Sequence, residues 1–142
     1  MFSPTRDQAR RFFVEAWRKR RQGEILSGLE HLAADLVLAH PEYHALLDDP
    51  DEALAKDFSA EAGQPNPFLH LSLHLAIEEQ LSIDQPPGIR RIADALAART
   101  GDRHAALHEI LECLGETVWR AQRDGAPPDA DAYLECLRRR AG

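Results

Sequence analysis

Apolar residues recur at spacings of three and four along most of the chain, which is the pattern of helices that bury one face. Near the start, Phe12, Phe13 and Trp17 fall on one side of a helix expected over residues 6–22. No segment alternates apolar and polar residues over the length of a strand. The pattern therefore predicts an all-α protein.

Proline, glycine and capping residues mark the ends of the predicted helices. Asn66-Pro67 is typical of a helix start, Asp102 is a suitable N-cap, and Gly101 is a suitable stop. The expected helices cover residues 6–22, 24–39, 41–47, 51–58, 66–83, 89–99, 102–123 and 129–140. We expect residues 1–142 to form a single-domain helical bundle of about four main helices plus short ones.

Within these helices, two sets of residues are expected to point inward. On the helix predicted over 24–39, the inward residues are Ile25, Leu29, Leu32 and Leu36. Trp17 and Trp119 are most simply interpreted as core residues.

The charge balance limits the partners of the protein. Lys and Arg number 17 against 24 Asp and Glu, a formal net charge of −7, which disfavours nucleic acid or an anionic membrane as the main partner. The basic clusters at 18–21 and 138–140 lie at expected helix C-termini, where they complement the helix dipole. No apolar run approaches the roughly 20 residues of a membrane span. We expect a cytoplasmic protein without a membrane partner, and a protein partner or a homo-oligomer stays open.

The two cysteines are interpreted in line with a cytoplasmic protein. Cys113 and Cys136 lie in separate helical segments without CxxC spacing. One disulfide between them is an open alternative, but a reduced pair fits a cytoplasmic protein better. We interpret Cys113 as a packing residue, because it faces away from His104 on the same helix.

Seven histidines are present, and four of them stand in two matching rows. The rows are His70, His74 and Glu78 in one helix, and His104, His108, Glu112 and Glu116 in another. Four residues advance a helix by about 6 Å and rotate it by about 40°, so each row forms a stripe along one flank. Two histidines at i and i+4 can chelate one metal ion.

Apolar residues border both stripes, which indicates that the stripes are at least partly buried. Unpartnered buried charges would cost several kcal/mol each, and a divalent cation would remove that cost. His40 and His44 are also four apart, and they can join the site if His40 caps the helix that Pro41 opens. The candidate metal ligands are His40, His44, His70, His74, Glu78, His104, His108, Glu112 and Glu116. His31, with Asp35 one turn on, is expected at the surface.

Imidazole and carboxylate ligands together suit iron, manganese or zinc, held as one ion or as a dinuclear centre. A redox metal would handle oxygen or peroxide. Zinc would activate water for hydrolysis, with Glu78, Glu112 or Glu116 as the base. The alternative is a non-catalytic interaction or scaffold protein, whose His–Glu network is structural and holds no metal. A nucleic-acid-binding protein that uses its terminal arginines is the weakest of the three hypotheses.

The sequence contains no phosphate-binding glycine loop, no GxSxG and no HExxH. It does resemble a known family through HPEYH (40–44), NPFLHLSLHLAIEEQLSIDQPPGIR (66–90) and HAALHEILECLGETVWRAQRDG (104–125). These stretches, with the SPTRDQARRFFVEAW opening, resemble small proteobacterial proteins that share an uncharacterised domain of unknown function. The resemblance implies a bacterial, cytoplasmic protein and no particular activity. The histidine rows are also similar in style to haemerythrin-like and di-iron bundles, although the Glu-x-x-His motif of the carboxylate di-iron proteins is absent.

Overall fold

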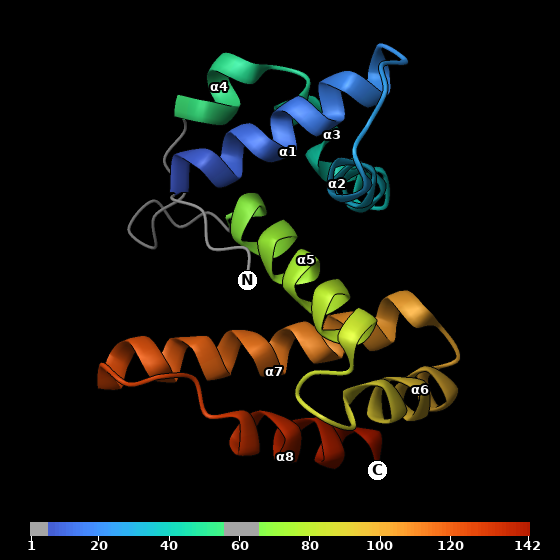
Figure 1. Ribbon diagram of the computed structural model, residues 1–142, viewed down its shortest axis with the longest axis vertical. Helices are drawn as coiled ribbons and strands as arrows, with labels where there is room; N and C mark the ends of the chain where they lie inside the picture. Colours follow the sequence, from blue (N-terminus) through green and yellow to red (C-terminus); the bar gives the residue numbers. More distant parts are fainter. Residues whose placement is uncertain (1–5, 56–65) are drawn as a thin grey trace. The chain divides into compact units, whose positions relative to one another are not determined.

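In a computed structural model of the chain, which describes residues 6–55 and 66–142, α-helices dominate (Figure 1). No strand occurs in either described range. The prediction of an all-α protein is confirmed, and the helices follow in the expected order. None of the described helices is both long and apolar enough to cross a membrane.

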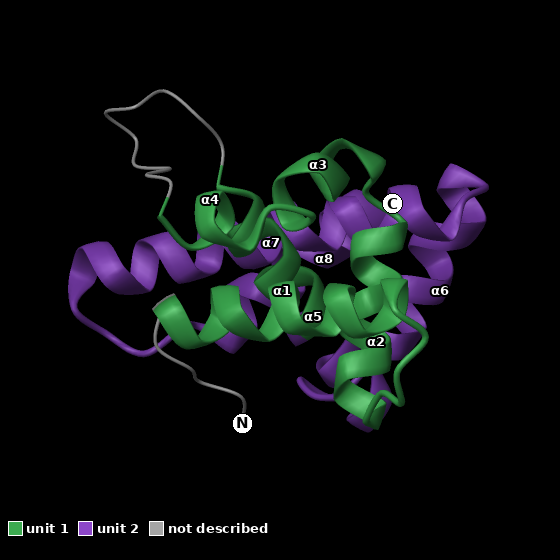
Figure 2. Ribbon diagram, turned by 90° about the horizontal axis from the view of Figure 1, so that it is seen from above, with its two compact units in different colours: residues 1–75 green, residues 76–142 purple. Residues whose placement is uncertain are grey.

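The chain divides into two compact units, residues 1–75 and 76–142 (Figure 2). The boundary falls inside one helix, α5, so each unit is described by itself. The first unit contains α1 (Arg6–Arg21), α2 (Gly28–Leu38), the 3-10 turn η1 (Pro41–Tyr43), α3 (His44–Leu47), α4 (Pro50–Ala55) and the first half of α5 (Pro67–Ile83). The second contains the rest of α5, α6 (Ile89–Thr100), α7 (Arg103–Asp124) and α8 (Ala130–Ala141). The assignment of residues 1–142 to one domain stays a prediction.

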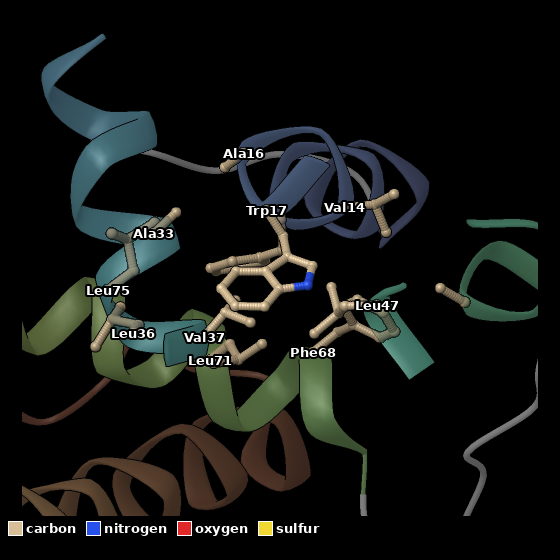
Figure 3. Packing of buried hydrophobic residues seen from close by; sticks show 12 residues of the cluster. Val14, Ala16, Trp17, Ala33, Leu36, Val37, Leu47, Phe68, Leu71 and Leu75 are labelled. Atoms are coloured by element: carbon tan, nitrogen blue, oxygen red, sulfur yellow. The ribbon is translucent and has the colours of Figure 1, made fainter. Parts of the chain in front are cut away.

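Trp17 lies in the core of the first unit, where Val37, Leu47 and Phe68 surround its indole (Figure 3). Its side chain is buried, as predicted, and the indole Nε1 donates a hydrogen bond to Asp48 Oδ1 at 2.8 Å. Burying an apolar side chain of this kind contributes about 2 kcal/mol. This core fixes α2 and α5 within the unit, and these two helices lead to the histidines considered below.

Helix α2 begins later than predicted. Ser27 and Glu30 form a capping box: Ser27 Oγ accepts from the Glu30 amide at 3.2 Å, and Glu30 Oε1 accepts from the Ser27 amide at 3.0 Å. The helix therefore starts at Gly28, and Ile25, which precedes it, is 93% exposed. Leu29 lies in the first turn and is also exposed. The prediction that Ile25 and Leu29 point inward is wrong: Ile25 precedes the helix that the cap starts at Gly28, and the Leu29 side chain is exposed in its first turn.

In the second unit α6, α7 and α8 pack against one another (Figure 1). Gly101 ends α6 with φ +74°, a conformation that favours glycine. Asp102 then caps α7, as predicted, because its side chain accepts from the amides of His104 and Ala105. Fully buried residues from the three helices include Leu96, Ile110 and Leu137.

Two side chains of α7 differ from expectation. Cys113 forms a disulfide with Cys136 of α8, so the prediction of a reduced pair is wrong. The packing of α7 on α8 brings the two Cα atoms to 5.9 Å, a proximity that their spacing of 23 residues does not reveal. Trp119 is 58% exposed and lies under the guanidinium of Arg123, 5.0 Å from its ring centre, so its assignment to the core is wrong.

Candidate metal site

His40 follows the last turn of α2, and its ring closes that helix end. The ring Nδ1 lies 2.7 Å from the carbonyl oxygen of Leu36, one of the last carbonyls of a helix that lack an amide partner further along. A carbonyl only accepts, so Nδ1 must carry the proton and donate. In the neutral ring the lone pair is then on Nε2, and Nε2 is oriented toward α5.

Helix α5 presents His70 and His74 one turn apart, with ring centres 4.8 Å from each other. The His40 ring centre lies 4.9 Å from each of these two rings, and all three pairs meet at steep angles. His40 Nε2 is 3.1 Å from His70 Nε2. His40 and His74 are almost fully buried, and His70 is half-buried. The first unit therefore brings three of the predicted ligands together from two separate elements.

The ring nitrogens of these three histidines lie close enough together to hold a metal ion. Each of the three histidines offers one nitrogen, and these nitrogens lie within 4.8 Å of one another. Two imidazole nitrogens on a tetrahedral zinc are separated by about 3.3 Å, given Zn–N bonds of about 2.0 Å. The 3.1 Å separation between His40 and His70 is already close to that value. A histidine cluster that can bind a metal ion is thus present.

Tyr43 packs beside these rings. It stacks on His40 with the planes 5° apart and the ring centres 5.4 Å apart, and its ring centre is 6.1 Å from that of His70. Burial, and to a smaller extent the charge of Glu42, raises the pKa of the Tyr43 hydroxyl. The phenol therefore stays protonated at neutral pH and offers a hydrogen-bond donor and an aromatic face.

His44 does not join this group. Its Nε2 donates to the carbonyl oxygen of Val37 at 2.8 Å, and its ring packs on Trp17 with centres 4.6 Å apart. Like His40 it donates to a carbonyl near the α2 C-terminus, but its ring faces the apolar core. His31 is 61% exposed and pairs with Asp35 at 3.2 Å, which confirms its predicted place at the surface.

The three predicted carboxylate ligands each pair with an arginine in the second unit. Glu78 Oε1 lies 3.2 Å from Arg103, Glu116 pairs with Arg120 at 2.6 Å, and Glu112 pairs with Arg140. The reason lies in the helix repeat. Each four-residue step adds about 40°, so a carboxylate two or three steps beyond the first histidine is rotated by about 80° or 120°. Their role as metal ligands stays a prediction that these contacts do not support.

His104 and His108 lie on α7, in the second unit. Their ring centres are 4.2 Å apart, so the two rings of this i, i+4 pair lie against each other. That this second row supplies ligands stays a prediction.

The family of the chain can be stated at this point. The model of a domain of unknown function, DUF1841, matches residues 5–139, nearly the whole chain. The chain belongs to the DUF1841 family. No curated protein and no solved structure matches it. The resemblance to an uncharacterised family is confirmed, and it assigns no activity, so any function of this DUF1841 protein has to be argued from its own residues.

Two parts of the DUF1841 site were not predicted from the sequence. One is the Leu36 carbonyl, which orients His40, and the other is the stacked ring of Tyr43. A usable signal was present in HPEYH, since an aromatic residue three positions after His40 in a tight turn can stack on it. The carbonyl could not be found this way, because the prediction carried α2 to residue 39 without assigning its final hydrogen bonds.

Proposed function

We propose that this DUF1841 protein binds a divalent transition-metal ion through His40, His70 and His74. The observation that carries the proposal is the hydrogen bond from His40 Nδ1 to the Leu36 carbonyl. Metal-binding histidines commonly donate their second ring nitrogen to a backbone carbonyl, which fixes the tautomer and the ring orientation. Here the bond leaves the Nε2 lone pair 3.1 Å from a second imidazole nitrogen.

The set of three imidazole donors limits which metal ions suit the site. Three imidazoles suit zinc, iron, copper or nickel, whereas manganese prefers the oxygen ligands that are paired with arginines here. Zinc and iron are therefore favoured among the three metals that the sequence suggests. A three-histidine ion keeps positions for water or substrate, so zinc would promote hydrolysis, and iron would support chemistry with oxygen or peroxide. The tyrosine beside the rings would then contact whatever binds there.

The experiment measures metal content in protein purified without a histidine tag. We expect about one equivalent of zinc or iron in the wild type by elemental analysis, and its loss in His74→Ala. His31→Ala is the matched control, because His31 is a surface histidine outside the cluster. His70→Gln serves as a second variant, because half-buried His70 is easier to replace without unfolding than fully buried His74.

Several outcomes decide the proposal. Wild-type protein that binds no zinc or iron in calorimetric titration, or a His70→Gln/His74→Ala variant that binds as tightly as the wild type, would overturn it. Retention of metal in His31→Ala with loss in the cluster variants supports it. His108→Ala, measured beside them, tests the separate prediction that the second row supplies ligands to this or to another ion.

One observation favours a metal-free alternative. The 3.1 Å between His40 Nε2 and His70 Nε2 is also a hydrogen-bond length, so His70 can donate to His40 in a structural network. In that case the protein would be an interaction or scaffold protein, as the second hypothesis from the sequence states. Nitrogen-15 spectra of the imidazoles distinguish the two, because added zinc shifts the ligating nitrogens only if a metal binds.

A further inference from the structure

A groove of about 720 Å³ lies between the C-terminal half of α7, the loop after it and α8, entirely within the second unit. This volume falls in the range of small-molecule sites. The groove is not part of the histidine cluster, since every residue lining it belongs to residues 116–140. A ligand of this groove would therefore be bound by residues outside the cluster.

One of the two cysteines of the disulfide, Cys136, lines this groove. Cys136 is half-buried, whereas Cys113 is only 1% exposed. Cys136 is therefore the more accessible of the two cysteines to an incoming thiolate. Thiol–disulfide exchange requires access to the attacked sulfur, so the two halves of this disulfide are chemically unequal.

The groove is lined by four carboxylate residues (Glu116, Asp124, Asp129 and Glu135) and by four arginines, and the arginines can bind the carboxylates of a ligand. The four arginines are Arg120, Arg123, Arg139 and Arg140. Each of them pairs with a carboxylate at the surface, as Arg139 does with Glu135 at 3.3 Å. Exposed pairs of this kind contribute at most about 1 kcal/mol, so the carboxylates of a ligand can take over an arginine at little cost.

We propose that this groove is a thiol–disulfide exchange site for a small anionic thiol, with Cys136 as the sulfur that is attacked in the reducing direction and that attacks in the oxidising direction. In the reducing direction, the thiolate of the ligand attacks Cys136 Sγ, the Cys113–Cys136 bond breaks, and Cys113 leaves as a thiolate that takes a proton from water. A second thiol then attacks the mixed disulfide. It releases Cys136 as a thiol and departs in a disulfide with the first ligand.

The test compares two single-cysteine variants with glutathione disulfide, which is anionic, as the probe. In Cys113→Ala the remaining Cys136 should attack the probe, form a mixed disulfide detected by mass spectrometry, and release one glutathione thiolate. Cys136→Ala is the matched control and retains only the buried Cys113. We expect Cys136 to react at least about tenfold faster. Equal rates, or a faster Cys113, would overturn the proposal.

Charge selectivity is tested on the same Cys113→Ala background. The rate with glutathione disulfide, divided by the rate with cationic cystamine, should fall several-fold when Arg139→Gln and Arg140→Gln are added. An unchanged ratio contradicts the anionic-ligand part of the proposal. If either single-cysteine variant fails to fold, wild-type protein is reduced with glutathione in buffer and in urea. A folded protein that resists reduction over a time in which the unfolded chain is fully reduced overturns the proposal.

Discussion

Tyr133 shows how one buried hydroxyl ties stability to pH. Its side chain is 3% exposed, and its hydroxyl donates to Gln80 Oε1 at 2.8 Å. Burial raises the pKa of this phenol well above its ordinary value of about 10. The folded state therefore holds the proton at a pH at which the unfolded state releases it. The resulting stability is fully present below pH ~10 and is lost as the pH rises above that value.

We expect Tyr133→Phe to lower the free energy of unfolding by about 1 kcal/mol at pH 8, because the hydrogen bond to Gln80 is lost. Between pH 9 and pH 11 the variant should lose less stability than the wild type, since it has no phenol to ionise at this position. Urea denaturation across this pH range measures both effects. Parallel pH curves for the two proteins would contradict the assignment.

At the same scale, the sequence predicted part of the membership of the histidine cluster. Periodicity placed His70 and His74 on one flank of one helix, and the first unit brings them to His40. It also included His44, whose ring instead packs on Trp17. Which way each histidine turns depends on which carbonyls at the end of α2 lie within reach of its ring, Leu36 for His40 and Val37 for His44. That detail is a property of the folded backbone and not of residue spacing.

At the scale of elements, the start of α2 depends on two side chains. Replacing Ser27 by Ala removes the acceptor for the Glu30 amide, and we expect it to lower the free energy of unfolding by about 1 kcal/mol. Ser82→Ala is the control, because Ser82 is exposed and caps no helix start; its effect should stay within about 0.5 kcal/mol. Chemical denaturation compares the two, and equal losses would show that the capping box contributes nothing specific.

The pairing of α7 with α8 depends in part on a covalent link. The disulfide closes a segment of 23 residues, which by loop-closure entropy stabilises the folded state by about 3 kcal/mol. Cys113→Ala/Cys136→Ala should lose about this amount in denaturation experiments. Wild-type protein fully reduced with dithiothreitol should lose a similar amount, whereas dithiothreitol should leave the double variant unchanged. A double variant as stable as the oxidised wild type would contradict the link.

The elements themselves were largely predictable. Asp102 and Gly101 marked the boundary between α6 and α7 in the sequence, because caps act through neighbouring backbone groups. The start of α2 was missed although Ser27 and Glu30 have capping-box spacing, because apolar periodicity was followed back to Ile25. The disulfide was out of reach, since it depends on how two helices pack.

For the molecule as a whole, a bound ion would link parts of the chain that are far apart in sequence. His40 and His70 are 30 residues apart, and the unfolded chain offers no preformed site for them. Free zinc at about one hundred times its dissociation constant should therefore stabilise the protein by about 2.7 kcal/mol. The unfolding midpoint should rise with zinc in the wild type and in His31→Ala, and fall with a chelator. An equal rise in His74→Ala would show that zinc acts elsewhere.

The imidazole caps at the end of α2 also determine how a mutational scan of this protein should be interpreted. His44 holds the Val37 carbonyl and packs on Trp17, so replacing it should damage folding as severely as replacing a ligand. A screen that scores only abundance or growth would rank His44 with His40 and His74. Metal content measured on the soluble fraction of each variant separates His44, which supports folding, from His40 and His74, which we propose as metal ligands.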